Sequence, residues 1–199
     1  MAIIFTDNFD RADSTNLGAN WTERSAGVGD WGISGNQLRA LTGQGGSCAY
    51  ASGAVPPNAD YEVQSNLSND SGFPYAGITI RTVPFGTNDA DYYFFLWAPG
   101  TLRFYLRQSG NWTMLGNIGD NEGNPINTVL KLKAVGNNIK AYKGGALKFD
   151  ITNSALTAKG TGGVAQLVAN TIANYDNFTI DDGLVATVNA NSAFILNMI

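Results

Sequence analysis

The chain has 199 residues, of which 44% are apolar and only 14% charged, well below the charged quarter of an ordinary soluble domain. A net charge of −4 argues against a nucleic-acid-binding surface, because affinity for phosphates comes from clustered Lys and Arg. The absence of histidine excludes Ser-His-Asp and Cys-His catalysis and histidine-bound zinc.

Short alternating segments between turn signals predict an antiparallel β-sandwich. The predicted strands follow a β-like run at 3–6 and cover residues 31–34, 37–41, 61–67, 77–83, 92–98, 102–108, 128–135, 138–142, 147–150, 164–168 and 175–181. Hairpin-type turns that need positive φ are predicted at residues 34–36, 109–111, 136–138 and 143–145. The single cysteine, Cys48, is predicted to be a small buried strand residue.

Alternation is clearest in residues 101–107. Two sets of side chains are predicted to lie on opposite faces of this strand: Leu102, Phe104 and Leu106 on one, and Arg103, Tyr105 and Arg107 on the other. Residues 92–97 are instead apolar at every position, so we expect both faces of that strand to be covered. One face would contact the core and the other a subunit interface or a long loop. Lys131 and Lys133 share a strand face, which we interpret as solvated sheet surface.

The tripeptide Asp-Asn-Phe occurs twice, at residues 7–9 and 176–178, each time beside a β-like run. This repetition predicts that the two chain ends meet as neighbouring strands, as they do in jelly rolls. The second copy closes a predicted domain of residues 1–182, and residues 183–199 form a tail of different composition.

The tail from residue 184 onward has no charged side chain. Its large apolar residues are Leu184, Val185, Val188, Phe194, Ile195, Leu196, Met198 and Ile199. Two interpretations stay open: a last strand or cap on the same domain, or an arm that docks on a neighbouring subunit or another protein. No signal peptide and no run of about 20 apolar residues is present, so we expect a soluble protein made in the cytoplasm, with no membrane partner, that stays there or is exported by a non-standard route.

Several segments together resemble concanavalin A-like lectin/glucanase domains, the laminin-G and laminarinase-like jelly rolls. The resemblance extends over about residues 3–182 and is carried by residues 5–11, 17–22, 31–38, 76–81, 91–95, 132–142 and 164–181. It implies an all-β fold, an antiparallel two-sheet jelly-roll sandwich. Domains of this kind are common in bacterial surface proteins and in structural proteins of tailed bacteriophages.

The resemblance includes glycosidases, whose retaining members carry Glu-x-Asp-x-x-Glu on one strand. The three glutamates of this chain, Glu23, Glu62 and Glu122, are far apart and none lies in that motif. Asp89 and Asp91 flank a predicted strand start, where aspartate is usually a turn residue. We therefore predict that the protein is not an enzyme.

The resemblance also implies a ligand groove on the concave sheet. Six side chains at alternating positions of three strands are the candidates: Arg81, Tyr93, Trp97, Arg103, Tyr105 and Arg107. Aromatic rings stack on sugars and arginines bind hydroxyls or carboxylates, so these residues would suit a glycan. The alternative is that they are buried packing residues.

Related sandwiches hold a structural calcium ion where the terminal strands meet. By resemblance, Asp176 with Asp7 or Asn8 would supply the oxygen ligands. Alternatively, these side chains cap their own turns. We expect no other cofactor.

Three functions follow from the resemblance. The first is a bacteriophage virion component made in the host cytoplasm, a capsid decoration or cement protein or a tail-associated protein. It would dock on other virion proteins or on copies of itself, so a homo-oligomer is expected. The second is a carbohydrate-binding module for a cell-surface or polysaccharide glycan, and the third is a degenerate laminarinase-like glycosidase.

Overall fold

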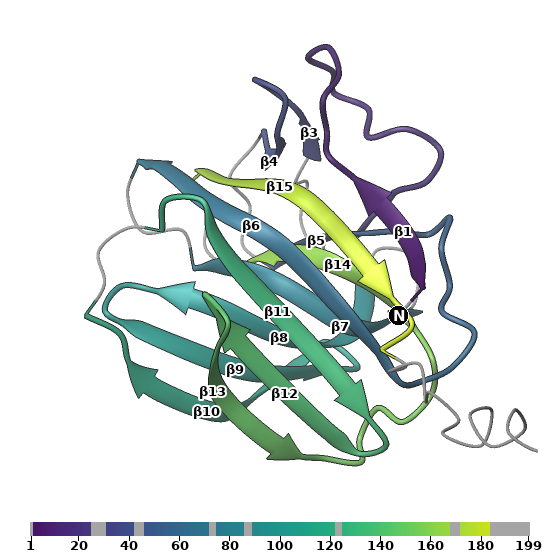
Figure 1. Ribbon diagram of the computed structural model, residues 1–199, viewed down its shortest axis with the longest axis vertical. Helices are drawn as coiled ribbons and strands as arrows, with labels where there is room; N and C mark the ends of the chain where they lie inside the picture. The colour runs from purple at the N-terminus through teal and green to yellow at the C-terminus, as the bar shows by residue number, and fades with distance from the viewer. Residues whose placement is uncertain are drawn as a thin grey trace, which may run out of the picture.

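The fold is all-β, with two antiparallel sheets packed face to face, as predicted (Figure 1). The computed structural model describes residues 2–24, 31–41, 46–71, 75–85, 89–121, 125–167 and 172–183. Within these ranges no residue is helical, so the described chain contains no helix that could cross a membrane. Residues 184–199, for which a cap or a docking arm is predicted, lie outside the described residues.

One sheet has eight strands. Its strands are β1 (Ile3–Asp7), β3 (Trp31–Ile33), β4 (Leu38–Ala40), β6 (Tyr61–Ser71), β11 (Thr128–Val135), β12 (Asn138–Lys143), β13 (Ala146–Thr152) and β15 (Ile172–Asp181). Their order is β13-β12-β11-β6-β15-β4-β3, and β1 also pairs with β15.

The other sheet has seven strands. These are β2 (Thr22–Arg24), β5 (Ser47–Tyr50), β7 (Ala76–Phe85), β8 (Asp89–Ala98), β9 (Thr101–Gln108), β10 (Asn111–Gly119) and β14 (Thr161–Gln166), in the order β10-β9-β8-β7-β14-β5-β2. The strand ranges predicted above do not include β2 or β10. In β10, Gly116 interrupts the alternation of apolar and polar residues. Glycine is required there because a Cβ would lie 2.6 Å from the ring of Phe149.

The main core lies between the two sheets and is rich in large aromatic side chains. Trp31, Tyr61, Phe95, Phe104 and Tyr175 are all fully buried in it. Burial of this much apolar surface, at about 25 cal/mol per Å², is the main force that holds the sheets together.

The two chain ends meet as the repeated tripeptide predicts. β1 pairs with β15 so that Asp7 lies opposite Phe178, and Figure 1 shows the two strands side by side. The ring of Trp21 packs between the two phenylalanines of the repeats, 5.5 Å from Phe9 and 5.0 Å from Phe178 between centroids. Each tripeptide contains one residue at positive φ, Phe9 at 53° and Asn177 at 49°.

A second apolar cluster lies on the opposite face of the seven-stranded sheet. It contains Tyr92, Phe94 and Leu96 of β8, whose neighbours Tyr93, Phe95 and Trp97 belong to the main core. The prediction that both faces of this strand are covered is therefore confirmed. Cys48 of β5 is buried in the same cluster, also as predicted.

Candidate functional site

The six residues predicted to line a groove do not share one face of the sheet. Arg81, Tyr93 and Trp97 are fully buried, and the two aromatic residues belong to the core between the sheets. Arg103 and Tyr105 lie on the other face, beside the second apolar cluster. The prediction of one open groove made by all six is wrong.

Strand register is the physical reason. The hairpin between β8 and β9 turns over two residues, so Ala98 pairs with Thr101. This register places Tyr93 opposite Leu106 and Trp97 opposite Leu102, which face the core. Side chains directly opposite in a pair of antiparallel strands share a face, so the arginines of β9 must lie on the side of Tyr92 and Phe94.

Arg81 and Arg107 are both structural cations. The guanidinium of Arg81 donates hydrogen bonds to the carbonyl oxygens of Leu156, Ala59 and Gly136. The guanidinium of Arg107 lies beside two rings, 5.8 Å from the centroid of Tyr92 and 5.2 Å from that of Trp112, and donates a hydrogen bond to Asp89 at 2.8 Å.

The ring of Trp112 on β10 packs over the second apolar cluster. Its centroid lies 5.9 Å from that of Tyr92, 6.1 Å from Phe94 and 5.8 Å from Tyr105. Tyr92 and Phe94 beneath it have no exposed surface. This face of the seven-stranded sheet is therefore packed rather than open to a ligand.

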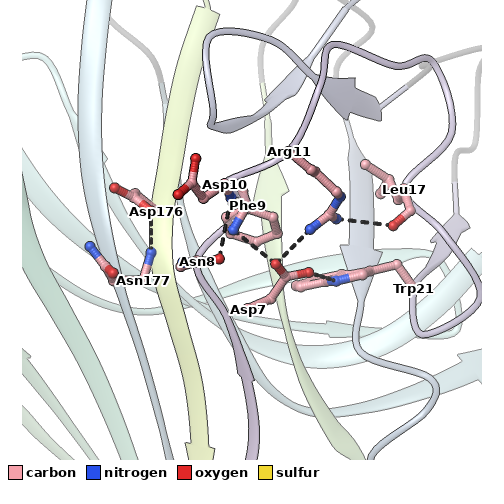
Figure 2. A network of polar contacts seen from close by, with 9 residues as sticks. All are labelled: Asp7, Asn8, Phe9, Asp10, Arg11, Leu17, Trp21, Asp176 and Asn177. Atoms are coloured by element: carbon pink, nitrogen blue, oxygen red, sulfur yellow. Dashed lines mark hydrogen bonds and ion pairs between the residues drawn. The ribbon is translucent and has the colours of Figure 1, made fainter.

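The residues proposed for calcium lie where the chain ends meet (Figure 2). The carboxylate of Asp7 accepts hydrogen bonds from the backbone N–H of Phe9 at 2.8 Å, from Arg11 at 2.7 Å and from the indole N–H of Trp21 at 2.8 Å. These donors, one of them cationic, occupy Asp7, which is therefore a poor calcium ligand in this arrangement.

Asn8 and Asp176 serve their own turns. Asn8 accepts a hydrogen bond from the N–H of Asp10 at 3.2 Å, and Asp176 accepts one from the N–H of Asn177 at 2.7 Å (Figure 2). Among the described residues, no group of three or more Cys, Asp or Glu side chains comes together to hold a metal ion. Calcium binding stays a prediction. The hydrogen bonds of Asn8 and Asp176 support the alternative, that these side chains cap their own turns.

A hollow of about 390 Å³ lies on the outer face of the eight-stranded sheet, away from the core. We call it the lysine hollow, and it is lined by Glu62, Lys131, Lys133, Val135, Asn138, Lys140, Tyr142 and Gly145. The charged residues come from three neighbouring strands, β6, β11 and β12. Alternation explains their position, since Leu130, Leu132 and Ala134 of β11 face the core.

Ion pairs order the polar lining. Glu62 is almost fully buried and receives Lys133 at 2.5 Å and Lys131 at 3.3 Å. The ammonium of Lys131 also lies 4.8 Å from the ring centroid of Tyr142. Lys140 pairs with Asp150 of β13 at 3.3 Å, and both of these side chains are substantially exposed.

Two ionisable groups at this site have shifted pKa values. The hydrogen bond to Glu62 raises the pKa of Lys133, so the ammonium stays protonated. On the neighbouring strand, burial raises the pKa of Asp181, which lies opposite Glu62 in the register.

The carboxyl groups at the hollow bear on the question of hydrolysis. Glycoside hydrolysis needs two carboxyl groups, separated by about 5–9.5 Å, across the bond that breaks. Glu62 lines the hollow and is held by two ammonium groups, and Asp181 lies opposite it on β15. Glu23 accepts a hydrogen bond from the N–H of Trp31, and Glu122 lies outside the described residues.

The sequence contained a signal for half of this site. Lys131 and Lys133 were predicted to share a solvated face, but Lys140, Tyr142 and Glu62 were not placed with them. The two-residue turn after Val135 pairs Val135 with Asn138, which puts Lys140 and Tyr142 on the face of the two lysines.

The fold is similar to that of carbohydrate-binding and carbohydrate-degrading proteins. The carbohydrate-binding module CBM66 from Bacillus subtilis is 18% identical, with a TM-score of 0.68 over 81% of this chain and 95% of that one. A Bacillus subtilis protein of unknown function with a galectin-like fold is 11% identical, with a TM-score of 0.68 over 92% and 96% of the two chains. An endo-β-1,3-glucanase from Pyrococcus furiosus is 13% identical, with a TM-score of 0.60 over 89% and 93%.

These likenesses confirm the concanavalin A-like jelly-roll fold that the sequence predicted. No protein-family model matches the sequence, and no curated protein matches it significantly. At identities below 25% the shared fold by itself assigns no activity, so function has to be argued from the site.

Proposed function

We propose that this protein is a non-catalytic carbohydrate-binding module whose ligand occupies the lysine hollow. The observation that carries the proposal is the composition of the hollow: an aromatic ring, amine donors and a carboxylate acceptor on one open sheet face. Sugars offer hydroxyl groups to such donors and acceptors, and an apolar ring face to an aromatic side chain.

Size and fold both support this reading. A volume of about 390 Å³ lies within the range of about 300–1,000 Å³ that is usual for small-molecule sites. One of the similar structures is described as a carbohydrate-binding module and another as a glucanase, so this jelly roll serves sugar recognition in other proteins. Glu62 is held by two ammonium groups, which favours binding over hydrolysis.

The test is binding to a panel of soluble polysaccharides by affinity gel electrophoresis, with the wild type and two tyrosine variants. Tyr142→Ala should weaken binding by about tenfold or more, because the ring lines the hollow. Tyr105→Ala is the matched control, since Tyr105 is also partly buried but lies on the outer face of the other sheet. Urea unfolding of both variants checks that each still folds.

Each outcome has a defined meaning. Loss of binding in Tyr105→Ala but not in Tyr142→Ala would move the site to the seven-stranded sheet. Failure of the wild type to bind any glycan of the panel would overturn the proposal. Release of reducing sugar from laminarin or another β-glucan by the purified protein would overturn its non-catalytic part.

The virion-component hypothesis ranks second. It depends on the apolar residues of 184–199, which lie outside the described residues, and the similar structures give it no support. Deletion of residues 184–199 followed by light scattering tests it. If the truncated protein keeps the oligomeric state of the full chain, the tail is not the assembly arm.

A further inference from the structure

Two lysines of the lysine hollow face each other across neighbouring strands, which does not favour the stability of the sheet. Lys133 of β11 lies directly opposite Lys140 of β12, and like charges at such positions destabilise a sheet. Their acidic partners lie on the outer sides: Glu62 on β6 pairs with Lys133, and Asp150 on β13 pairs with Lys140. Across the four strands the order of side chains is therefore Glu62, Lys133, Lys140 and Asp150, with the two lysines next to each other.

A third lysine lines the same hollow. Lys131 pairs with the same Glu62 and has its ammonium over the ring of Tyr142. Three lysines line the hollow with Glu62, and the carboxylates of Asp150 and Asp181 lie beside them, so the positive charge is confined to the facing ammonium groups of Lys133 and Lys140. Within the Debye length of about 8 Å at physiological salt, the local charge decides which ligand is attracted.

An acidic sugar gains more from this arrangement than a neutral one. To stack on the face of Tyr142 that Lys131 covers, it would have to displace the ammonium and lose a cation–π contact. A sugar with a carboxylate or sulfate can instead accept charge-assisted hydrogen bonds from the lysines, which are about twice as strong as neutral ones.

We propose that the lysine hollow is selective for acidic saccharides, with Lys133 and Lys140 as the pair that holds the carboxylate or sulfate group. This inference rests on the proposed carbohydrate-binding function and narrows its ligand class. The acid group lies between the two facing lysines and relieves their repulsion, while Glu62 and Asn138 provide an acceptor and an amide for neighbouring hydroxyls.

The experiment compares acidic glycans with their neutralised forms by affinity electrophoresis in about 150 mM salt. The probes are polygalacturonate against its methyl ester, and heparin against desulfated heparin, so that the two pairs separate carboxylate from sulfate recognition. A thymidine oligonucleotide measures attraction to any polyanion. At least one acidic probe should bind about tenfold more tightly than its neutralised form and than the oligonucleotide.

Two lysine variants that remove the same charge test whether acidic probes bind in the hollow. Lys140→Gln should weaken binding to the acidic probe by about fivefold or more, because it removes one of the facing ammonium groups. Lys159→Gln removes the same charge from an exposed position outside the hollow and should leave binding unchanged.

The outcomes separate this inference from the function on which it rests. Equal binding of acidic and neutralised probes overturns the selectivity and leaves the carbohydrate-binding proposal standing. Equal loss in the two lysine variants, or equal binding of the oligonucleotide, shows general charge attraction and overturns the inference. Binding of no glycan at all overturns both.

Discussion

The outer faces of the two sheets differ, although each is the solvent side of one layer of the same sandwich. On the seven-stranded sheet, Tyr92 and Phe94 are fully buried beneath Trp112. On the eight-stranded sheet, Lys131 and Lys140 keep about a third of their side-chain surface exposed. The difference follows from the strands: β8 is apolar at successive positions, whereas β11 and β12 alternate between core-facing and polar residues.

This contrast decides where a ligand can bind. A sheet face that is apolar must be covered, because exposed apolar surface is costly in water, and once covered it serves as a second core. A polar face can stay open and hold charged side chains in fixed positions through cross-strand pairs. Four predictions test the contrast between the two faces.

The largest expected effect is on stability. Leu96→Ala removes a fully buried side chain from the outer face of the seven-stranded sheet and should lower the free energy of unfolding by about 2–5 kcal/mol. Leu147→Ala is the matched change on the eight-stranded sheet, where the side chain is 49% exposed, and should cost no more than about 0.5 kcal/mol. Urea denaturation measures both, and equal costs would show that the two faces are equally covered.

The next prediction concerns chemical reactivity. Burial raises the pKa of the Cys48 thiol from 9.0 to about 12, so at pH 8 only about one thiol in 10⁴ is ionised. Cys48 should not react with a disulfide reagent until the protein is unfolded in guanidinium, whereas Lys140 should be acetylated readily in the native state. Rapid reaction of the native thiol would mean that the second apolar cluster opens to solvent.

The same thiol sets a pH dependence. Above pH 9 the unfolded thiol ionises while the buried one stays protonated up to about pH 12, so the unfolded state binds fewer protons. Stability should therefore fall as the pH rises from 9 to 12. Cys48→Ala removes this contribution, and its denaturation curve should depend less on pH across that window.

The smallest expected effect is in the lysine hollow. Lys131→Gln and Lys133→Gln should each lower the free energy of unfolding by about 1 kcal/mol or less, because Glu62 keeps one ammonium partner. The double variant should cost more than the sum, because it leaves an almost fully buried carboxylate without either lysine. Additive costs in a double-mutant cycle would show that the two lysines do not share Glu62.

Much of the fold could be predicted from local signals, and much of the site could not. The repeated Asp-Asn-Phe predicted that the chain ends meet, and Asp7 does lie opposite Phe178. The groove prediction failed because it placed Trp97 and Tyr105 on one face without following the register across the turn between their strands. The length of the two-residue turn at Pro99-Gly100 determines which side chains of β8 and β9 share a face, since one extra residue would move every side chain of β9 to the opposite face.

The lysine hollow shows more clearly what local sequence patterns cannot predict. Pairing across the turn after Val135 could have joined Lys133 to Lys140, but nothing in the local sequence brings Glu62 beside them. Glu62 comes from a strand about 70 residues earlier, and the sheet order alone makes β6 the neighbour of β11.

The sequence by itself determined the class of fold, the positions of most strands and the meeting of the chain ends, because alternation and turn chemistry act over a few residues. Only the tertiary structure decided which sheet face is packed and which is open. That choice depends on long-range contacts: Trp112 over β8, and Glu62 between two lysines of β11. Strand pairing and side-chain cover are set by neighbours distant in sequence, which local patterns do not encode.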